Sequence, residues 1–255
     1  MIENFSQYGK YILENNDLQI RLPNVEIIIT KMSDSSIQYS RQNNSGKNLK
    51  KIINVQNLKD PEFELCPVFP IHTPAQKTRD FVFLRMKNSY QIGTKSSSVI
   101  DLQFPIEIGF FIKRNDNIKE RIDVIACEPK HARFALYGDP QKGTLCKFAN
   151  VDLANDQNTT KYVYSEISVS IHNELPKEIS IGKFVFPISY NKMYYDESHV
   201  YVDGIEAVIH EVQGKHLVKI LKTEFNKDTN NLNISPSGNH TNKDQILYIM
   251  DRGFD

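Results

Sequence analysis

Five residues near the middle of the chain carry side chains that could act together on a ligand: Glu107, Asp123, His131, Arg133 and Tyr137. Paired carboxylates can perform acid–base chemistry when their separation and surroundings suit it. The same residue types also form cross-strand salt-bridge ladders, in which Arg133 would pair with Glu107 or Asp123. The five residues therefore predict either a ligand- or partner-binding site or a structural ladder, and both alternatives stay open at this point.

Period-2 alternation predicts that β-strands position all five side chains. In the first of three stretches, Glu107 points away from the face that Phe104, Ile106, Ile108 and Phe110 share. If the three strands are neighbours, the polar side chains line one surface of a sheet. The stretches are FPIEIGFF at 104–111, RIDVIAC at 121–127 and KHARFALY at 130–137.

The rest of the chain shows the same preference for strands, and helical periodicity is nearly absent. We expect an all-β fold with antiparallel β-sandwich or barrel architecture. Asp203-Gly204 and Gln213-Gly214 predict the turns of a three-stranded meander over 199–222, because Asp-Gly between apolar runs favours two-residue hairpins. Further strands are expected within 17–32, 81–84, 163–171 and 179–188, with a turn at 138–143 and a last strand near the C-terminus.

Three polar stretches, 33–51, 149–160 and 225–244, are predicted to be loops. The second would link an N-terminal β domain, 1–150, to a C-terminal β domain, 161–255. The alternative is one continuous domain with this loop on its surface. The third stretch is rich in Asn and poor in apolar residues, so it is predicted to be mobile and without a pairing partner.

Composition limits the classes of function. Lys plus Arg and Asp plus Glu both number 31 among 255 residues, so the formal net charge is zero. A strongly basic nucleic-acid binder would carry an excess of positive charge, and no nucleic-acid partner is expected. Three cysteines without short spacing and seven scattered histidines offer no preorganised metal site. We therefore expect no metal, no cofactor, and buried, reduced thiols at Cys66, Cys127 and Cys146.

The beginning of the chain lacks the basic and apolar segments of a signal peptide. No apolar run approaches the roughly 20 residues of a transmembrane helix. A cytoplasmic location is therefore predicted. The motifs GxGxxG, GxxxxGKS/T, GxSxG, HExxH and CxxC are all missing from the sequence, which favours a non-enzymatic protein without excluding an enzyme.

Five motifs follow one another along nearly the whole chain. They are ELCPVFPIHTP at 64–74, FPIEIGFF at 104–111, HARFALYGDPQKGTLCKF at 131–148, GKFVFPISYNKMYY at 182–195 and YIMDRGF at 248–254. In this order they resemble an archaeal family catalogued as a domain of unknown function, number four hundred and thirty-two. The resemblance carries over no catalytic residues, because the family has none assigned. It implies an accessory role beside mechanosensitive channels, with a membrane protein as the partner.

Two hypotheses for function follow from these observations. The first is an intracellular binding or adaptor module that holds a protein partner through a sheet face or loops. The second is an enzyme, or a carbohydrate or small-molecule binder, that uses the carboxylate, histidine and arginine cluster. A concave pocket containing Glu107, Asp123 and His131 would favour the second hypothesis, and a flat or filled surface there would favour the first.

Overall fold

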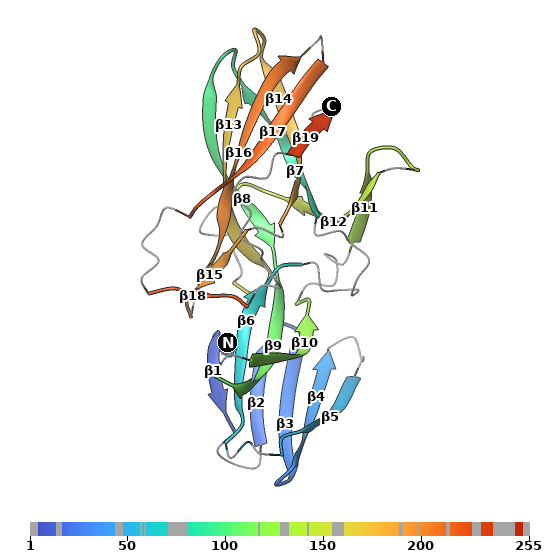
Figure 1. The fold of residues 1–255 in the computed structure, drawn as a ribbon, viewed down its shortest axis with the longest axis vertical. Helices are drawn as coiled ribbons and strands as arrows, with labels where there is room; N and C mark the ends of the chain where they lie inside the picture. The colour runs from blue at the N-terminus through green and yellow to red at the C-terminus, as the bar shows by residue number, and fades with distance from the viewer. Residues whose placement is uncertain are drawn as a thin grey trace.

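The protein is built from β-strands in the computed structural model, which confirms the predicted fold class. Figure 1 shows an elongated molecule with one group of strands toward each end of its long axis. No helix occurs among the described residues, so none there is long and apolar enough to cross a membrane. The described residues are 5–13, 17–43, 48–56, 58, 60–70, 81–116, 118–127, 133–141, 143–154, 161–188, 191–197, 199–212, 215–225, 231–236 and 248–251.

Two four-stranded antiparallel sheets form the first sandwich, at the lower end of the molecule in Figure 1. Their inner faces carry alternating apolar residues, and the rings of Phe63 and Phe110 stack there with centroids 5.5 Å apart. One sheet has the order β1 (Gly9–Ile12), β6 (Glu62–Val68), β9 (Glu107–Asn115), β10 (Ile118–Ile125), and the other β2 (Asp17–Leu22), β3 (Val25–Ser33), β4 (Ser36–Asn43), β5 (Asn48–Asn54).

A second sandwich of two further sheets occupies the upper end. Two strand pairs in it, β7 with β12 and β13 with β16, are parallel, whereas every other described pair in the molecule is antiparallel. One sheet has the order β11 (Arg133–Tyr137), β12 (Thr144–Val151), β7 (Phe81–Ile92), β14 (Ile179–Pro187). The other has the order β18 (Asn233–Ile234), β15 (Met193–Tyr195), β16 (Val200–Val212), β13 (Tyr164–Asn173), β8 (Ser97–Pro105), with β17 (Lys215–Thr223) beside β16 and β19 (Tyr248–Asp251) beside β17.

The chain passes from the second sandwich to the first at Ile106. The single strand predicted over 104–111 is wrong, because β8 ends at Pro105 and β9 begins at Glu107. Between them, the backbone N–H of Ile106 donates to the carbonyl of Val163 at 3.0 Å. All residues from 103 to 112 are buried, so this segment has no open polar face.

Two further local predictions are wrong. The stretch 33–51 contains the whole of β4 and the first four residues of β5; Ile37 and Tyr39 of β4 point inward, and Arg41 on the same strand reaches Asp123 on β10. Asp203 and Gly204 form no hairpin turn but lie inside the long strand β16, at a β-bulge opposite β13. The predicted meander is therefore a single hairpin of β16 and β17; the turn at 213–214 lies outside the described residues.

The stretch 225–244 is partly paired. Residues Asn233 and Ile234 form β18 against β15, and the Ser235 hydroxyl donates to the carbonyl of Pro67 at 2.6 Å. The prediction that the backbone here has no partner is therefore wrong for β18. The prediction of mobility concerns mainly 226–230 and 237–244, which lie outside the described residues.

Strand pairing joins the two sides of the predicted linker at 149–160. Strands β7 and β8 precede the linker, and they pair with β14 and β13, which follow it. The first sandwich is instead built from residues 9–68 and 107–125. Independent folding of 1–150 and 161–255 stays a prediction, and the pairing favours the alternative of one continuous domain.

Candidate functional site

The structure places four of the five predicted residues, in three locations. Glu107 opens β9, Asp123 lies on the paired strand β10, and Arg133 and Tyr137 lie at the two ends of β11 in the second sandwich. His131 lies outside the described residues, and so does the side chain of Arg133. Glu107 and Asp123 each have a cationic partner that the sequence did not suggest.

Glu107 forms an ion pair in the protein interior with Lys147. Their side chains join the first sandwich to β12 of the second, with 3.0 Å between Lys147 Nζ and Glu107 Oε1. Each residue is only 1% exposed. The ammonium also lies 5.4 Å from the ring centroid of Phe134 on β11, an arrangement that permits a cation–π attraction. Among the described residues, no donor reaches the second carboxylate oxygen, Oε2.

Asp123 lies in a hydrogen-bonded network between the two sheets of the first sandwich. Its carboxylate accepts bonds from the Tyr39 hydroxyl at 2.6 Å and from Arg41 Nη1 at 2.8 Å, both on β4. Burial first, and the adjacent Asp123 charge second, raise the pKa of Tyr39. Nearby, the Lys51 ammonium donates to the carbonyl of Ile122 at 2.6 Å. Asp123 thus fastens β10 to β4, and its partners come from the stretch that was predicted to be a loop.

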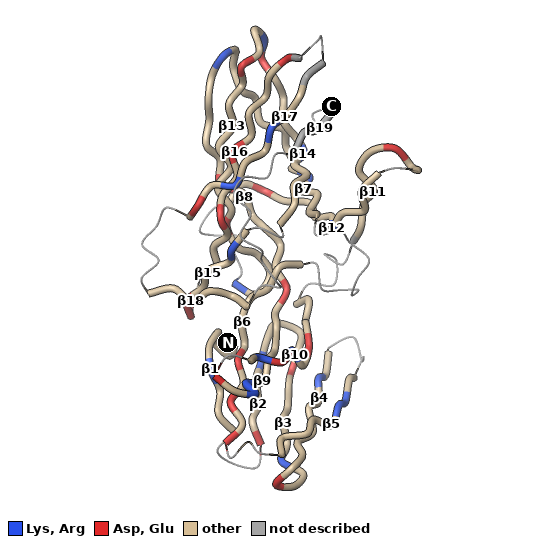
Figure 2. Tube along the Cα trace, viewed as in Figure 1, with Lys and Arg blue, Asp and Glu red and all other residues tan. Residues whose placement is uncertain are grey.

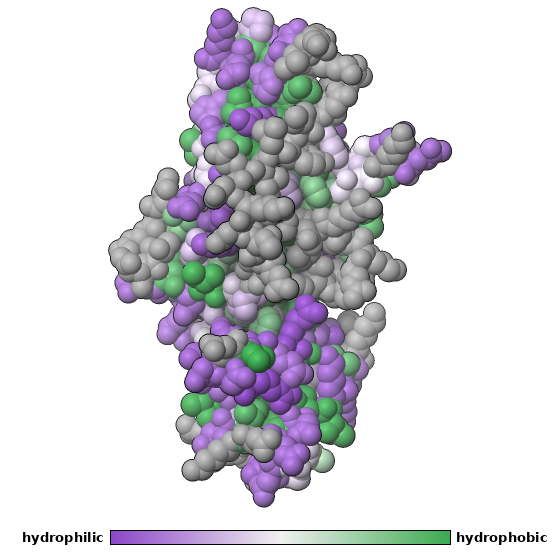
Figure 3. Space-filling model, viewed as in Figure 1, coloured by the Kyte–Doolittle hydropathy of each residue, from purple (hydrophilic) through white to green (hydrophobic). Residues whose placement is uncertain are grey.

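The outer part of the hairpin of β11 and β12 projects from the body as an arm, defined here as residues 135–145 (Figure 1). The predicted turn at 138–143 is confirmed. Asp139 organises this turn, because its carbonyl accepts a bond from the N–H of Gly143 and its carboxylate one from the N–H of Gln141. Tyr137 packs edge-to-face on Phe83 of β7, with centroids 6.2 Å apart. Figure 3 shows the arm standing clear of the body, with a hydrophilic tip.

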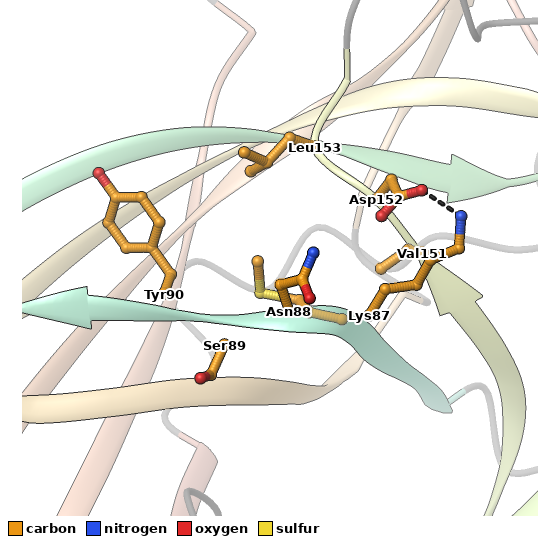
Figure 4. A pocket seen from close by; sticks show the side chains of 8 residues that line it. Lys87, Asn88, Ser89, Tyr90, Val151, Asp152 and Leu153 are labelled. Carbon is orange, nitrogen blue, oxygen red and sulfur yellow. Dashed lines mark hydrogen bonds and ion pairs between the residues drawn. The ribbon is translucent and has the colours of Figure 1, made fainter.

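A pocket of about 280 Å³ lies in the second sandwich, between β7 and the segment that follows β12. Figure 4 shows the side chains of Lys87 and Asp152 meeting at one end of it, where they form an ion pair. Leu153 and Tyr90 lie toward the other end. The pocket contains none of the five residues that the sequence suggested. Its lining residues are Met86, Lys87, Asn88, Ser89, Tyr90, Val151, Asp152 and Leu153.

Asp203, which the sequence pattern predicted to lie in a hairpin turn, is a buried carboxylate inside β16. It accepts hydrogen bonds from the N–H of Lys192 at 2.7 Å and that of Phe225 at 3.3 Å. The Tyr194 hydroxyl donates a further bond at 3.3 Å, and the Lys222 ammonium lies at 2.9 Å. The carboxylate is therefore well satisfied and holds the ends of β15 and β17 to the bulge of β16. The sequence contained one sign of this buried carboxylate, because Asp203 stands between a valine and a glycine in an otherwise apolar run.

The described residues contain no group of three or more His, Cys, Asp or Glu side chains that could hold a metal ion. Several of their carboxylates, among them those of Glu107, Asp123 and Asp203, instead take part in internal ion pairs and hydrogen bonds. The partners of Glu107 and Asp123 therefore fix the position of strands, whereas the pocket and the arm offer exposed surface for contacts with other molecules.

The comparisons with known proteins agree with the order of motifs along the chain. No curated protein and no solved structure matches the sequence. One family matches residues 7–251, which covers all nineteen described strands. The chain therefore belongs to the family described as Protein of unknown function (DUF432).

Proposed function

We propose that this protein is a binding module that holds a protein partner through the projecting arm. The observation that carries the proposal is the exposure of Leu136, a large apolar side chain that is 46% exposed on β11. An apolar side chain on a projecting element is removed from water when a partner packs on it, which favours association. The hydrogen-bonded turn at Asp139 supports the tip, so that little ordering is needed on binding.

The edge of β11 strengthens the proposal. In the part of the chain that the structure describes, β11 pairs only with β12, so its outer edge has backbone donors and acceptors without a strand partner. Such an edge is a template for a strand from another chain. An adaptor role requires no catalytic group, and the strand edge refines the earlier hypothesis of a sheet face or loops as the contact.

The alternative hypothesis, an enzyme or small-molecule binder at the carboxylate cluster, has weaker support. Glu107 is buried against Lys147, and Asp123 is held by Tyr39 and Arg41. A carboxylate engaged in this way is poorly placed to take a proton from a substrate.

The partner and the location belong to the proposal as well. The family resemblance implies a membrane channel as the partner, and we propose that the protein acts from the cytoplasmic side. Figure 2 shows Lys and Arg interspersed with Asp and Glu along the described chain. This mixed pattern suits a protein partner better than a nucleic acid, which would favour a basic stripe.

A pair of matched substitutions tests the arm. Leu136→Asp places a charge on the arm, whereas Ile12→Asp places one on β1 of the first sandwich, at a residue of similar exposure, 49%. We expect chemical crosslinking in a native lysate to recover a set of partners with the wild-type protein, to lose it with Leu136→Asp and to retain it with Ile12→Asp. Equal recovery by wild type and Leu136→Asp would contradict the proposal.

A further inference from the structure

We propose that the pocket between β7 and the segment after β12 is a second binding site, which takes an extended peptide segment of a partner protein as an added strand beside β7. This site is separate from the arm. It therefore goes beyond the proposed function, and either proposal can fail while the other stands.

Strand β12 leaves part of one edge of β7 open. The two strands pair in parallel only as far as Val151 and Met86. The chain then crosses toward β8, where Leu153 forms a β-bridge with Leu102 and the N–H of Gln103 donates to the carbonyl of Asp152 at 3.0 Å. Beyond Met86, no described strand therefore pairs with this edge of β7.

A bulge lies on the opposite side of the same segment of β7. Strand β14 pairs with β7 at Arg85 and again at Tyr90, and it spans the residues between them with Gly182 alone. Lys87, Asn88 and Ser89 therefore have no ladder partner on either side among the described strands, and all three are exposed. Their backbone groups form a short extended template, the kind of surface that strand addition uses.

The walls of the pocket combine polar, apolar and paired charged side chains. Figure 4 shows Asn88 and Tyr90 directed into the pocket and Ser89 directed away from it. Apolar atoms of Leu153 and the buried Met86 contribute to the lining. The charges of Lys87 and Asp152 neutralise each other at one end. The pocket therefore favours an uncharged, apolar side chain from the incoming strand, while the backbone of β7 supplies the hydrogen bonds.

The probe for this site is a phage-displayed library of random ten-residue peptides, selected on the full-length protein. We expect it to yield peptides with an apolar residue near the centre. A selected peptide, synthesised with a fluorescent label, should bind wild type and Leu136→Asp with dissociation constants that agree within about twofold. Leu153→Asp should weaken binding at least tenfold, because it places a charge in the apolar wall.

Amide hydrogen exchange shows whether the peptide binds along this edge of β7. In the free protein, the amides of Lys87, Asn88 and Ser89 should exchange rapidly, and the peptide should slow their exchange. Asn88→Pro removes one of these donors within an exposed bulge, so it should weaken peptide binding and serves as the second variant if Leu153→Asp fails to fold.

Four outcomes would overturn the inference. The first is a library that yields no binding peptide. The second is binding that neither Leu153→Asp nor Asn88→Pro weakens. The third is protection that appears only outside residues 86–91. The fourth is slow exchange at these amides in the free protein, which would show that a segment of this chain or a second copy already covers the edge.

Discussion

Glu107 and Lys147 place two opposite charges in the interior at the junction of the two sandwiches. A buried pair of this kind contributes little net stability compared with well-packed apolar residues, because the desolvation of both ions offsets their attraction. The loss of one partner is different, because it leaves an uncompensated charge in the interior. The pair therefore acts mainly to specify how β9 and β12 meet.

Removing either partner alone tests this role. Lys147→Met should lower the free energy of unfolding by about 3–5 kcal/mol, and Glu107→Gln should also be destabilising. Each substitution leaves a buried charge without its partner. The double variant should lose less stability than the two single variants lose together. We expect the difference, measured in a double-mutant cycle, to be at least about 1.5 kcal/mol. Urea unfolding gives the free energies.

The surface pair Lys113 and Asp116 provides the control, because Asp116 is almost fully exposed. Lys113→Met should leave stability almost unchanged. Additive losses in the cycle at Glu107 and Lys147 would show that the two residues act independently, contrary to the expectation.

The three thiols give a second prediction at this scale. All three cysteines are buried, as predicted, and burial raises the pKa of Cys127 and of Cys146 to about 12. Only roughly 10⁻⁴ of such a thiol is ionised at pH 8, and the thiolate is the reactive form. Native protein should therefore react with a thiol-specific disulfide reagent far more slowly than protein unfolded in urea. A thiol that reacts in the native protein as fast as free cysteine would contradict this prediction.

At the scale of single elements, the bulge in β16 shows how a local signal can mislead. Asp203-Gly204 has the composition of a hairpin turn. A glycine is needed here, however, because the neighbouring strands β13 and β17 approach its backbone closely. A Cβ at Gly204 would lie 2.5 Å from the Thr223 hydroxyl oxygen and 2.9 Å from the carbonyl oxygen of Ser168. The dipeptide therefore marks the centre of a sheet and not its edge.

Two Gly→Ala substitutions distinguish a steric clash with a neighbouring strand from the general effect of replacing a glycine. Gly204→Ala should destabilise the protein by about 1–3 kcal/mol, because the added methyl group meets backbone on β13. A Cβ added at Gly182 would have Ser89 Cβ as its nearest neighbour, at 3.8 Å, which is an ordinary contact. Gly182→Ala should therefore change stability by less than about 1 kcal/mol. Similar melting temperatures for the two variants would refute the explanation.

Strands with strict alternation could be predicted from the sequence. Strand β13 alternates Ile167, Val169 and Ile171 with serines, and β14 was expected over nearly its observed range. Strand β4 was missed because only Ile37 and Tyr39 of its eight residues point into the core as large apolar side chains. Its polar composition resembles that of a loop, and only its pairing with β3 and β5 makes it a strand.

The candidate site was harder to predict than the strands. The importance of Glu107 and Asp123 was visible from charge within apolar runs, but their partners were not. Lys147 and Arg41 come from strands remote in sequence, so only the packing of one sheet on another brings them to the carboxylates. The pocket likewise depends on where β12 leaves β7, and no local pattern records that point.

At the scale of the whole molecule, tyrosines fasten the N-terminal segment to the second half of the chain. The Tyr8 hydroxyl donates to the carbonyl of Lys161, and the Tyr162 hydroxyl donates to that of Ser6 at 2.7 Å. Tyr195 on β15 donates to Glu64 on β6 at 2.9 Å, and its ring packs edge-to-face on Tyr8. These contacts join residues more than a hundred positions apart, so their loss should loosen both parts together.

The buried tyrosines predict a loss of stability in alkali. Burial is the main cause that raises the pKa of Tyr8, Tyr39 and Tyr195 above the ordinary value near 10. The unfolded chain can ionise these phenols from about pH 10 upward, whereas the folded protein holds them neutral. Their contribution to stability is therefore complete below about pH 10 and declines above it, by up to about 1.4 kcal/mol per pH unit for each tyrosine.

Urea unfolding between pH 8 and pH 11.5 measures this decline, and Tyr195→Phe provides the comparison. The variant lacks one phenol that must ionise on unfolding, so its stability should fall less steeply above pH 10 than that of the wild type. It should also begin from a lower stability at pH 8, because Glu64 loses a buried hydrogen bond. Equal slopes for the two proteins would show that Tyr195 ionises as readily in the folded state as in the unfolded chain, and that the contact between β6 and β15 opens before the protein unfolds.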